Sequence, residues 1–351
     1  MIRFGVIGYG YWGPNVVRNL HNLDGAQVVG VCDTNPTALA RAKRSYPSIR
    51  ATSDPSVLLS STDIDAVAVI TPVHTHFELA KAALQNGKHV FVEKPFTSSV
   101  AQAEELIELA ARQNLKIMVD HTFLFTGAVR KIRQLIDEGA LGNLYYYDST
   151  RVNLGLFQHD VNVVWDLAPH DLSIMDYLID ARPEALVATG ESHLNGLEDV
   201  AFITVYFPGN IIAHINVNWL SPVKVRTTLI GGERKMVVWN DLEADEKIKL
   251  YDKGVQVANR DGVYELLVSY RSGDMWAPHV EQVEALRLEM GYFVECVNKN
   301  EKAFNDGRAG LNVVRMLEAA DESLRKRGSL VYLDRLECKR QPQPSTLPVA
   351  V

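Results

Sequence analysis

The stretch IRFGVIGYGYWG, residues 2–13, decides the fold that we expect for this 351-residue chain. An apolar strand over Ile2–Ile7 leads into a GxGxxG loop, and a helix over Tyr11–Leu23 follows. In such a loop Gly8 permits the tight turn, Gly10 leaves room for a pyrophosphate beside the backbone, and Gly13 lets helix and strand pack closely. The helix start adds free N–H groups and the positive end of a dipole, which attract phosphate. Strand, loop and helix together predict a dinucleotide-binding site.

Asp33 lies 20 residues after the last glycine of this loop, at the end of a second predicted strand over Gln27–Cys32. An acid at this position hydrogen-bonds the ribose hydroxyls of the adenosine and repels a 2′-phosphate. No arginine follows directly, and we expect Arg41, Lys43 and Arg44 to be solvated. The sequence therefore favours NAD over NADP.

The first 120 residues continue as strands alternating with helices, which is typical of a doubly wound parallel sheet. The fold class expected is therefore α/β, with an N-terminal Rossmann domain over residues 1–121. Further strands are predicted over Ile49–Thr52, Ala66–Ile70, His89–Val92 and Lys116–Val119, with helices over Pro36–Ser45, Thr75–Gln85 and Ser98–Gln113.

Residues 122–336 follow a different pattern, in which short turns join many strands. Such connections favour antiparallel pairing, so we expect an α+β domain with a large, mainly antiparallel open sheet. A tail over residues 337–351 is rich in proline and is expected to be extended or poorly ordered. Strands are predicted over Leu144–Val152, Leu186–Glu191, Val200–Phe207, Ile211–Trp219, Val225–Ile230, Lys235–Trp239, Lys247–Tyr251 and Ser329–Leu333, with helices over Gly127–Glu138, Leu167–Leu178, Val280–Asn298 and Gly307–Arg327.

Composition excludes several function classes. Hydrophobic residues make up 47% and charged residues 23%, which indicates a globular protein rather than a disordered one. Lys and Arg number 36 against 43 Asp and Glu, a net charge of −7 that disfavours a nucleic-acid or membrane-surface binder. The three cysteines lack CxxC spacing, so neither a disulfide framework nor a metal site is expected. With no signal-peptide pattern at the start, we expect a cytoplasmic protein.

Two polar motifs follow strands of the predicted parallel sheet, at the edge where open α/β sheets bind ligands. The first is Thr71-Pro72-Val73-His74-Thr75-His76 after the strand ending at Ile70. Its simpler interpretation is a helix capped by Thr75 with both histidines exposed. The second is Glu93-Lys94-Pro95, in which proline fixes the chain's exit and lysine is expensive to bury. Periodicity alone describes this triplet as an exposed turn.

A third motif, Trp165-Asp166-Leu167-Ala168-Pro169-His170-Asp171, lies where a helix is expected to begin. Asp166 and His170 are four residues apart and share one helix face. A carboxylate beside an imidazole fixes its tautomer and raises its basicity, as a general base requires. The alternative is that Asp166 is only the N-cap, with Pro169 in the first turn and His170 exposed.

These features together resemble the Gfo/Idh/MocA oxidoreductase family, and the resemblance covers about residues 1–333. It implies a Rossmann domain followed by an α/β domain that binds substrate and forms oligomers. It also implies that Lys94 is the active-site lysine, and that Asp166 and His170 form the active-site pair. The cofactor-binding residues expected are Gly8, Gly10, Tyr11, Trp12, Gly13, Asp33, Thr71, Pro72, His74, His76, Glu93 and Lys94.

Several stretches most resemble the nucleotide-sugar 3-dehydrogenases of that family, which oxidise the 3-hydroxyl of a UDP-linked N-acetylhexosamine or its uronic acid. These stretches are residues 151–155, 160–172 and 219–226; a His-Phe pair often found downstream in that subgroup is Tyr292-Phe293 here. A UDP-sugar carries a pyrophosphate, which favours basic ligands. The substrate-binding residues expected are Lys94, Arg151, Asn153, Trp165, His170, Lys224 and Arg226. For Arg151, Lys224 and Arg226 the simpler interpretation is that they are solvated strand residues.

The expected reaction is the NAD-dependent oxidation of a secondary hydroxyl. His170 is the favoured base, Asp166 orients it, and Lys94 stabilises the developing alkoxide. The alternative is that Lys94, with a lowered pKa, is the base, so that the two roles are exchanged. Three alternatives are open: an inositol or free-sugar dehydrogenase, a glycoside hydrolase that uses NAD transiently, and a non-catalytic dinucleotide sensor.

The strand over Ile211–Trp219 predicts self-association. Odd positions from Ile211 to Trp219 are apolar, whereas the opposite face mixes Ile212 with His214, Asn216 and Asn218. This second face is too apolar for plain surface and too polar for a dry core. We therefore expect a homodimer or homotetramer through the C-terminal sheet, or contact with substrate there.

Overall fold

The computed structural model describes residues 1–155, 157–257 and 268–333, which divide into two compact units. The first unit holds residues 1–125 and 284–315, and the second holds the other described residues. The predicted tail over 337–351 lies outside the described residues. Among the helices that the structure describes, none is long and apolar enough to cross a bilayer.

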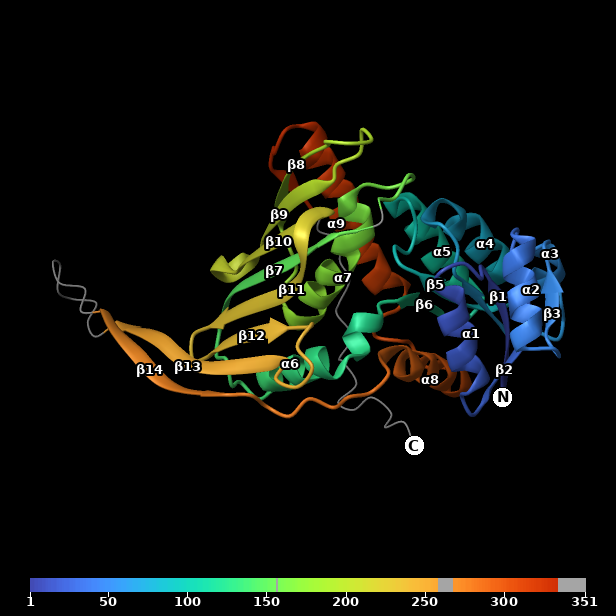
Figure 1. Cartoon of the computed structure of the whole chain (residues 1–351), viewed down its shortest axis with the longest axis horizontal. Coiled ribbons are helices and arrows are strands. Elements are labelled where there is room, and N and C mark those ends of the chain that lie inside the picture. Colours follow the sequence, from blue (N-terminus) through green and yellow to red (C-terminus); the bar gives the residue numbers. More distant parts are fainter. Residues whose placement is uncertain (156, 258–267, 334–351) are drawn as a thin grey trace. The chain divides into compact units, whose positions relative to one another are not determined.

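The first unit is the predicted doubly wound fold, with a six-stranded parallel sheet in the order β3-β2-β1-β4-β5-β6 (Figure 1). The central strands are buried on both faces because they are continuous apolar runs. The strands are β1 (Ile2–Ile7), β2 (Ala26–Cys32), β3 (Arg50–Thr52), β4 (Ala66–Val69), β5 (His89–Glu93) and β6 (Ile117–Asp120). The helices are α1 (Gly13–His21), α2 (Pro36–Ser45), α3 (Ser56–Leu59), α4 (Val73–Gln85) and α5 (Val100–Arg112), and the 3-10 turn η1 (Thr122–Phe125) follows β6.

Helix α8 (Ala285–Lys299) completes the first unit, although the division of the sequence at residue 121 assigned it to the second domain. The reason is aromatic packing. The ring centroid of Phe293 lies 6.0 Å from that of Phe4 on β1 and 5.9 Å from that of Phe91 on β5. All three side chains are fully buried. Strand propensity and turn signals carry no information on such long-range contacts.

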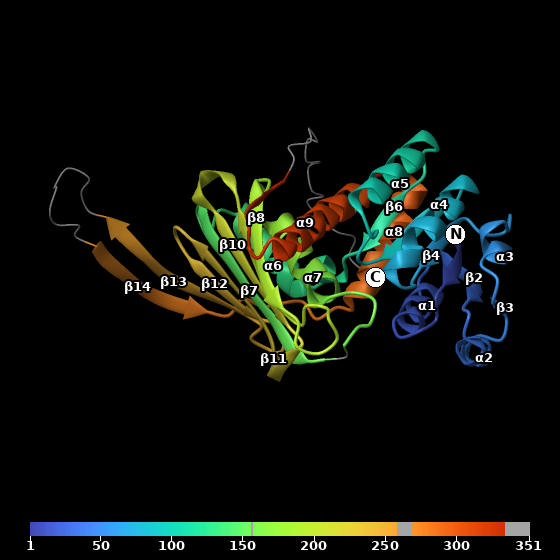
Figure 2. The ribbon, with the colours of Figure 1, turned by 90° about the horizontal axis from the view of Figure 1, so that it is seen from above.

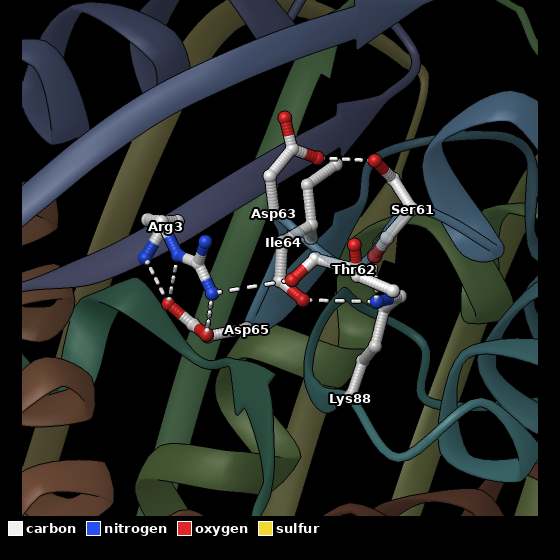
Figure 3. A network of polar contacts seen from close by, with 7 residues as sticks. All are labelled: Arg3, Ser61, Thr62, Asp63, Ile64, Asp65 and Lys88. Atoms are coloured by element: carbon white, nitrogen blue, oxygen red, sulfur yellow. Dashed lines mark hydrogen bonds and ion pairs between the residues drawn. The ribbon is translucent and has the colours of Figure 1, made fainter.

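A polar network fixes the amino ends of the neighbouring strands β1 and β4 (Figure 3). The Arg3 guanidinium donates to both carboxylate oxygens of Asp65, through Nε at 2.9 Å and Nη2 at 2.7 Å. This contact holds the pKa of Asp65 below its usual range. Lys88 is buried, and its Nζ donates to the carbonyls of Ser61 at 2.6 Å and Ile64 at 2.9 Å. The network therefore anchors the loop that leads into β4.

Replacing Lys88 with methionine tests this anchor. The methionine keeps most of the apolar stem, but the carbonyls of Ser61 and Ile64 lose their donor, so we expect the free energy of unfolding to fall by about 1–3 kcal/mol. Urea denaturation followed by far-UV circular dichroism measures this change. Lys131→Met is the control, because the Lys131 ammonium bonds to Gln134 in an exposed contact. If both substitutions changed the free energy of unfolding by the same small amount, Lys88 would not be an anchor of the loop that leads into β4.

The second unit is built on a nine-stranded sheet in the order β14-β13-β12-β11-β7-β10-β9-β8-β15. All pairs are antiparallel except β7 with β10, as expected for a mainly antiparallel sheet. Strand β14 is not among the predicted elements. The strands are β7 (Leu144–Leu154), β8 (Ala185–Glu191), β9 (Val200–Tyr206), β10 (Ile212–Asn218), β11 (Leu220–Gly232), β12 (Met236–Asn240), β13 (Ile248–Val257), β14 (Val268–Trp276) and β15 (Val331–Tyr332). The 3-10 turn η2 (Pro208–Asn210) joins β9 to β10, and the helices are α6 (Gly127–Asp137) and α7 (Val163–Leu178), with α9 (Gly307–Arg325) running from the first unit into the second.

Helices α6 and α7 lie on one face of this sheet and leave the other face open (Figure 2). On β10 the odd positions are buried and the even positions are exposed or half-buried, as the alternation predicts. The open face carries three large hydrophobic side chains: Phe202 and Tyr206 on β9, each 41% exposed, and Ile212 on β10, 42% exposed. His214 stacks on Phe202 with ring centroids 6.2 Å apart. Such a mixed face is unusual for plain surface, and its coverage by a second copy of the chain stays a prediction.

A charge placed on this open face provides a test. We expect the unmodified protein to be a dimer or tetramer at micromolar concentration, and Phe202→Asp to shift the mass toward the monomer, because a buried unpaired charge weakens an apolar contact. Multi-angle light scattering measures the mass. Val57→Asp, an exposed hydrophobic residue of the first unit, is the control. A monomeric unmodified protein would rule out the predicted assembly.

Candidate active site

The glycine-rich loop leaves space for a ligand at one glycine and none at the other two. A Cβ on Gly8, whose φ is +102°, would lie 2.0 Å from the carbonyl oxygen of Ile70. A Cβ on Gly13 would lie 2.2 Å from the Gly8 carbonyl oxygen. A Cβ on Gly10 would meet nothing within 4 Å. The space beside Gly10 and the start of α1 therefore fit a pyrophosphate close to the backbone.

The loop is held by two charged side chains. Asp33 accepts hydrogen bonds from the backbone N–H groups of Tyr9 at 2.6 Å and Asn35 at 2.7 Å. A carboxylate has about four acceptor positions, so these two bonds leave capacity for ribose hydroxyls. Arg41 is exposed, as expected, and its Nη2 also donates to the carbonyls of Tyr9 at 2.7 Å and Gly10 at 3.0 Å. These bonds were not predicted, because they form only when the long side chain on α2 reaches back to the loop.

The turn after β4 separates the two predicted histidines. His74 is exposed, whereas His76 is fully buried. Its Nε2 lies 2.7 Å from the Thr71 carbonyl oxygen, and its Nδ1 lies 2.9 Å from that of Pro95. Burial lowers the pKa of His76. His76 therefore ties the turn at Thr71 to the Glu93-Lys94-Pro95 segment, and its predicted contact with the cofactor stays a prediction.

The carboxyl ends of β5 and β6 bring further polar residues together. Glu93 pairs in register with Asp120, and His121 follows. His121 is buried with both ring nitrogens unpaired among the described residues, and burial lowers its pKa to about 4, with Asp120 opposing this shift and Lys94 adding to it. The indole Nε1 of Trp12 donates to Asp120 at 2.8 Å. Glu93, a predicted cofactor ligand, and Lys94, the predicted catalytic lysine, thus share this edge with two residues that were not predicted. These are Asp120 and His121.

Helix α7 begins four residues earlier than Leu167, which corrects the assignment of Asp166 as its N-cap. Asn162 is the N-cap, and its Oδ1 accepts from the Trp165 backbone N–H at 3.1 Å. Asp166 is in the first turn and Pro169 lies inside the helix. The Asp166 Oδ2 accepts a hydrogen bond from the indole Nε1 of Trp219 at 3.1 Å. Asp166 and His170 lie one turn apart in α7, and the orientation of His170 by Asp166 stays a prediction.

Two of the predicted substrate ligands bond inside the second unit instead. Arg151 is buried, and its Nε donates to Asp171 at 2.5 Å across the sheet-to-helix contact. Trp165 is also buried, and its indole donates to Asp321 at 2.7 Å. Buried charges require partners, and Arg151 has one in Asp171; contact of Arg151 and Trp165 with substrate stays a prediction. Of the other predicted ligands, Lys224 is exposed, and Asn153 and Arg226 are half-buried.

Comparison with known proteins identifies the family. Residues 2–121 match the model of the oxidoreductase family with an NAD-binding Rossmann fold. Residues 129–238 match that of the GFO/IDH/MocA C-terminal domain. The chain belongs to the Gfo/Idh/MocA oxidoreductase family. Its cofactor is NAD, in agreement with the glycine-rich loop and Asp33.

The similarity to named members of the family covers nearly the whole chain. UDP-N-acetylglucosamine 3-dehydrogenase from Acidithiobacillus ferrooxidans is 27% identical over 322 residues, which cover 89% of this chain and 94% of that protein. Its solved structure has a TM-score of 0.77 with 24% identity, covering 93% of this chain and 98% of that one. The NAD-dependent scyllo-inositol 2-dehydrogenase from Bacillus subtilis is 25% identical over 314 residues, covering 86% of this chain and 87% of that protein.

Sequence reasoning missed several residues that shape the Gfo/Idh/MocA site. Four of them, Arg41, Asp120, Trp219 and Glu289, have a polar group bonded to a partner far away in sequence, and the fifth, His121, is a buried histidine at the edge of the sheet. For Glu289 a signal existed: it lies on the same helical stripe as Leu286 and Phe293, where a carboxylate is unexpected. Trp219 gave no such signal, because it continues the apolar positions of the predicted strand Ile211–Trp219.

Asp33 predicts the choice between the two dinucleotides. We expect NAD to bind more tightly than NADP, and Asp33→Ser to reduce the ratio of their dissociation constants by about 10- to 100-fold, because a like charge no longer faces the 2′-phosphate. Isothermal titration calorimetry measures both constants. Asp24→Ser, an exposed acid of the same unit, serves as control. Equal affinities of the unmodified protein for NAD and NADP would contradict the role of Asp33.

Proposed function

We propose that this protein oxidises a secondary hydroxyl of a nucleotide-linked sugar, with the 3-hydroxyl as the target. The observation that carries the proposal is the similarity to UDP-N-acetylglucosamine 3-dehydrogenase along both halves of the chain. Retention of Lys94, Asp166 and His170 supports a catalytic protein over a dinucleotide sensor. The inositol dehydrogenase among the relatives supports a second candidate, a polyol as substrate.

Removing a hydride from an alcohol carbon leaves a proton on its oxygen. NAD supplies the hydride acceptor when it is bound. His170 takes the proton, since an imidazole has an ordinary pKa near the working pH. Asp166, held by the Trp219 indole, orients that imidazole. The Lys94 ammonium stabilises the negative charge that develops on the oxygen, and exchange of the two roles between Lys94 and His170 is the alternative.

The sugar-nucleotide pyrophosphate requires cationic partners. Lys224 and Arg226 lie on β11, where Lys224 is exposed and Arg226 is half-buried beside Asp241 at 3.5 Å. Burial and the neighbouring Arg151 lower the pKa of Arg226. A phosphate would relieve this repulsion between cations, so both residues stay in the proposal as pyrophosphate ligands. Asn153 stays as a candidate for the sugar hydroxyls.

A substrate screen tests the proposed function. Purified protein is mixed with NAD and one of three groups of alcohol: UDP-sugars, inositols or free hexoses, and NADH absorbance is recorded. Turnover of a UDP-N-acetylhexosamine or its uronic acid is the expected result. Faster turnover of an inositol or a free hexose would contradict the nucleotide-sugar proposal. Glycoside cleavage without net NADH, or dinucleotide binding without any turnover, would replace the dehydrogenase with a hydrolase or a sensor.

Three substitutions test the assigned roles on the identified substrate. Lys94→Ala and His170→Ala are each expected to lower kcat by about 10²–10⁴-fold, because an electrostatic contact or a general base is lost. Asp166→Asn is expected to be milder and to lower the pKa that kcat/KM reports for the base, because an amide supports the imidazolium less well. Steady-state kinetics across pH measures both effects.

Asp176→Asn, ten residues further along α7, is the matched control for Asp166→Asn and is expected to leave the pH profile unchanged. Thermal melts on all variants separate loss of fold from loss of chemistry. Normal turnover in all three active-site variants would show that the catalytic assignment is wrong.

A further inference from the structure

A cluster of buried polar side chains lies at the carboxyl end of β6 in the first unit. Asp120 is 2% exposed, and Glu289 on α8 and Asn305 are fully buried. Asn305 Nδ2 donates to the Glu289 Oε1 at 3.0 Å and to the Val119 carbonyl at 2.9 Å. The Glu289 side chain is also hydrogen-bonded to Asp120. Two carboxyl groups, 169 residues apart in sequence, therefore meet in the interior.

One proton must be shared between these carboxyl groups. Two buried carboxylates in contact repel each other strongly, so one of them stays protonated. The buried Glu289 Oε2 has no hydrogen-bond donor among the described residues, which disfavours a negative charge on this carboxyl group. Burial, Asp120 and the nearby Glu93 all raise the pKa of Glu289 well above its usual value.

The hydrogen bonds of Asp120 place the proton on Glu289. Asp120 accepts from the Trp12 indole at 2.8 Å through Oδ2 and from the Thr122 hydroxyl through Oδ1, so two donors stabilise its negative charge. Glu289 has the Asn305 amide as donor. The neighbouring His121 adds no compensating positive charge, since burial keeps it neutral at working pH. Glu289 is thus the hydrogen-bond donor of the pair and Asp120 the acceptor.

Trp12 connects this pair to the cofactor loop. It is the N-cap residue of α1, and its side chain does not bond to the helix N-terminus but extends to Asp120. In the sheet order, β1 and β6 are separated by β4 and β5, a span of about 14 Å at the usual strand spacing. The indole therefore ties the loop after β1 to the far end of the sheet's carboxyl edge.

We propose that Glu289 is a positioning residue for NAD binding, which donates a hydrogen bond to Asp120 and so holds Trp12 and the glycine-rich loop in the binding conformation. Glu289 is a third partner of the Asp120 carboxyl group, beside the Trp12 indole and the Thr122 hydroxyl. Without that donor, Asp120 loses one of its partners and turns toward other donors. The inference concerns the dinucleotide alone and is independent of the substrate proposed above.

Affinity for NADH tests the proposal on the full-length protein. Glu289→Gln replaces the protonated acid with an amide that also donates to Asp120 and accepts from Asn305, so the NADH dissociation constant should stay within about twofold. Glu289→Met has similar size and no donor, so the constant should rise about tenfold. Glu295→Gln, on the same helix in an exposed pair with Lys299, is the control. Calorimetric titration gives the constants, and thermal melts confirm folding.

A double-mutant cycle distinguishes positioning through Trp12 from a general structural role. Trp12→Phe removes the indole donor, and in this background Glu289→Met should weaken NADH binding by no more than about twofold, because the path to the loop is already broken. An undiminished tenfold effect in that background would overturn the proposal. If Glu289→Met does not fold, Glu289→Gln decides: a tenfold loss of affinity at an unchanged melting temperature would show that the proton on Glu289 is not what the loop requires.

Discussion

The backbone carbonyl of Ile70 lies where a Cβ on Gly8 would have to be. Two neighbouring strands, β1 and β4, therefore approach each other at the sheet's carboxyl edge only because residue 8 has no side chain and tolerates a positive φ. The next contact repeats the constraint, since Gly13 packs against the Gly8 carbonyl. The space beside Gly10, the direction of α1 and the position of the Thr71 turn all follow from this close packing.

Around the glycines, the binding edge is held by polar side chains whose partners are mostly backbone atoms or buried acids. Arg41 and Asp33 bond to the loop backbone itself, and His76 ties the turn after β4 to the segment after β5. These bonds were not among the predictions, which concerned only contacts with ligand or solvent. They make the edge rigid before NAD arrives, which lowers the ordering cost of binding.

The elements and faces of the fold could be predicted because they depend on local periodicity. Strand β1 and helix α2 have the bounds that the sequence predicts, and the alternation of β10 places Ala213 inside and His214 outside. The start of α7 was misplaced because Asn162 and Asp166 are both good N-caps, and only the contact of Asn162 with Glu198 and Asp321 decides between them. The Asp120–Glu289 pair could not be predicted, since no spacing relates two residues that meet only in the folded chain.

The chain leaves the first unit after residue 125 and returns to it at residue 284. A ribosome therefore finishes all six parallel strands long before it makes the helix that covers Phe4 and Phe91. Until α8 emerges, the nascent Rossmann sheet exposes an aromatic surface and lacks the carboxyl group that faces Asp120. The nucleotide-binding unit is thus completed late in synthesis. A protein truncated after residue 125 is expected to be prone to aggregation and to depend on a chaperone, and not to fold as an independent domain.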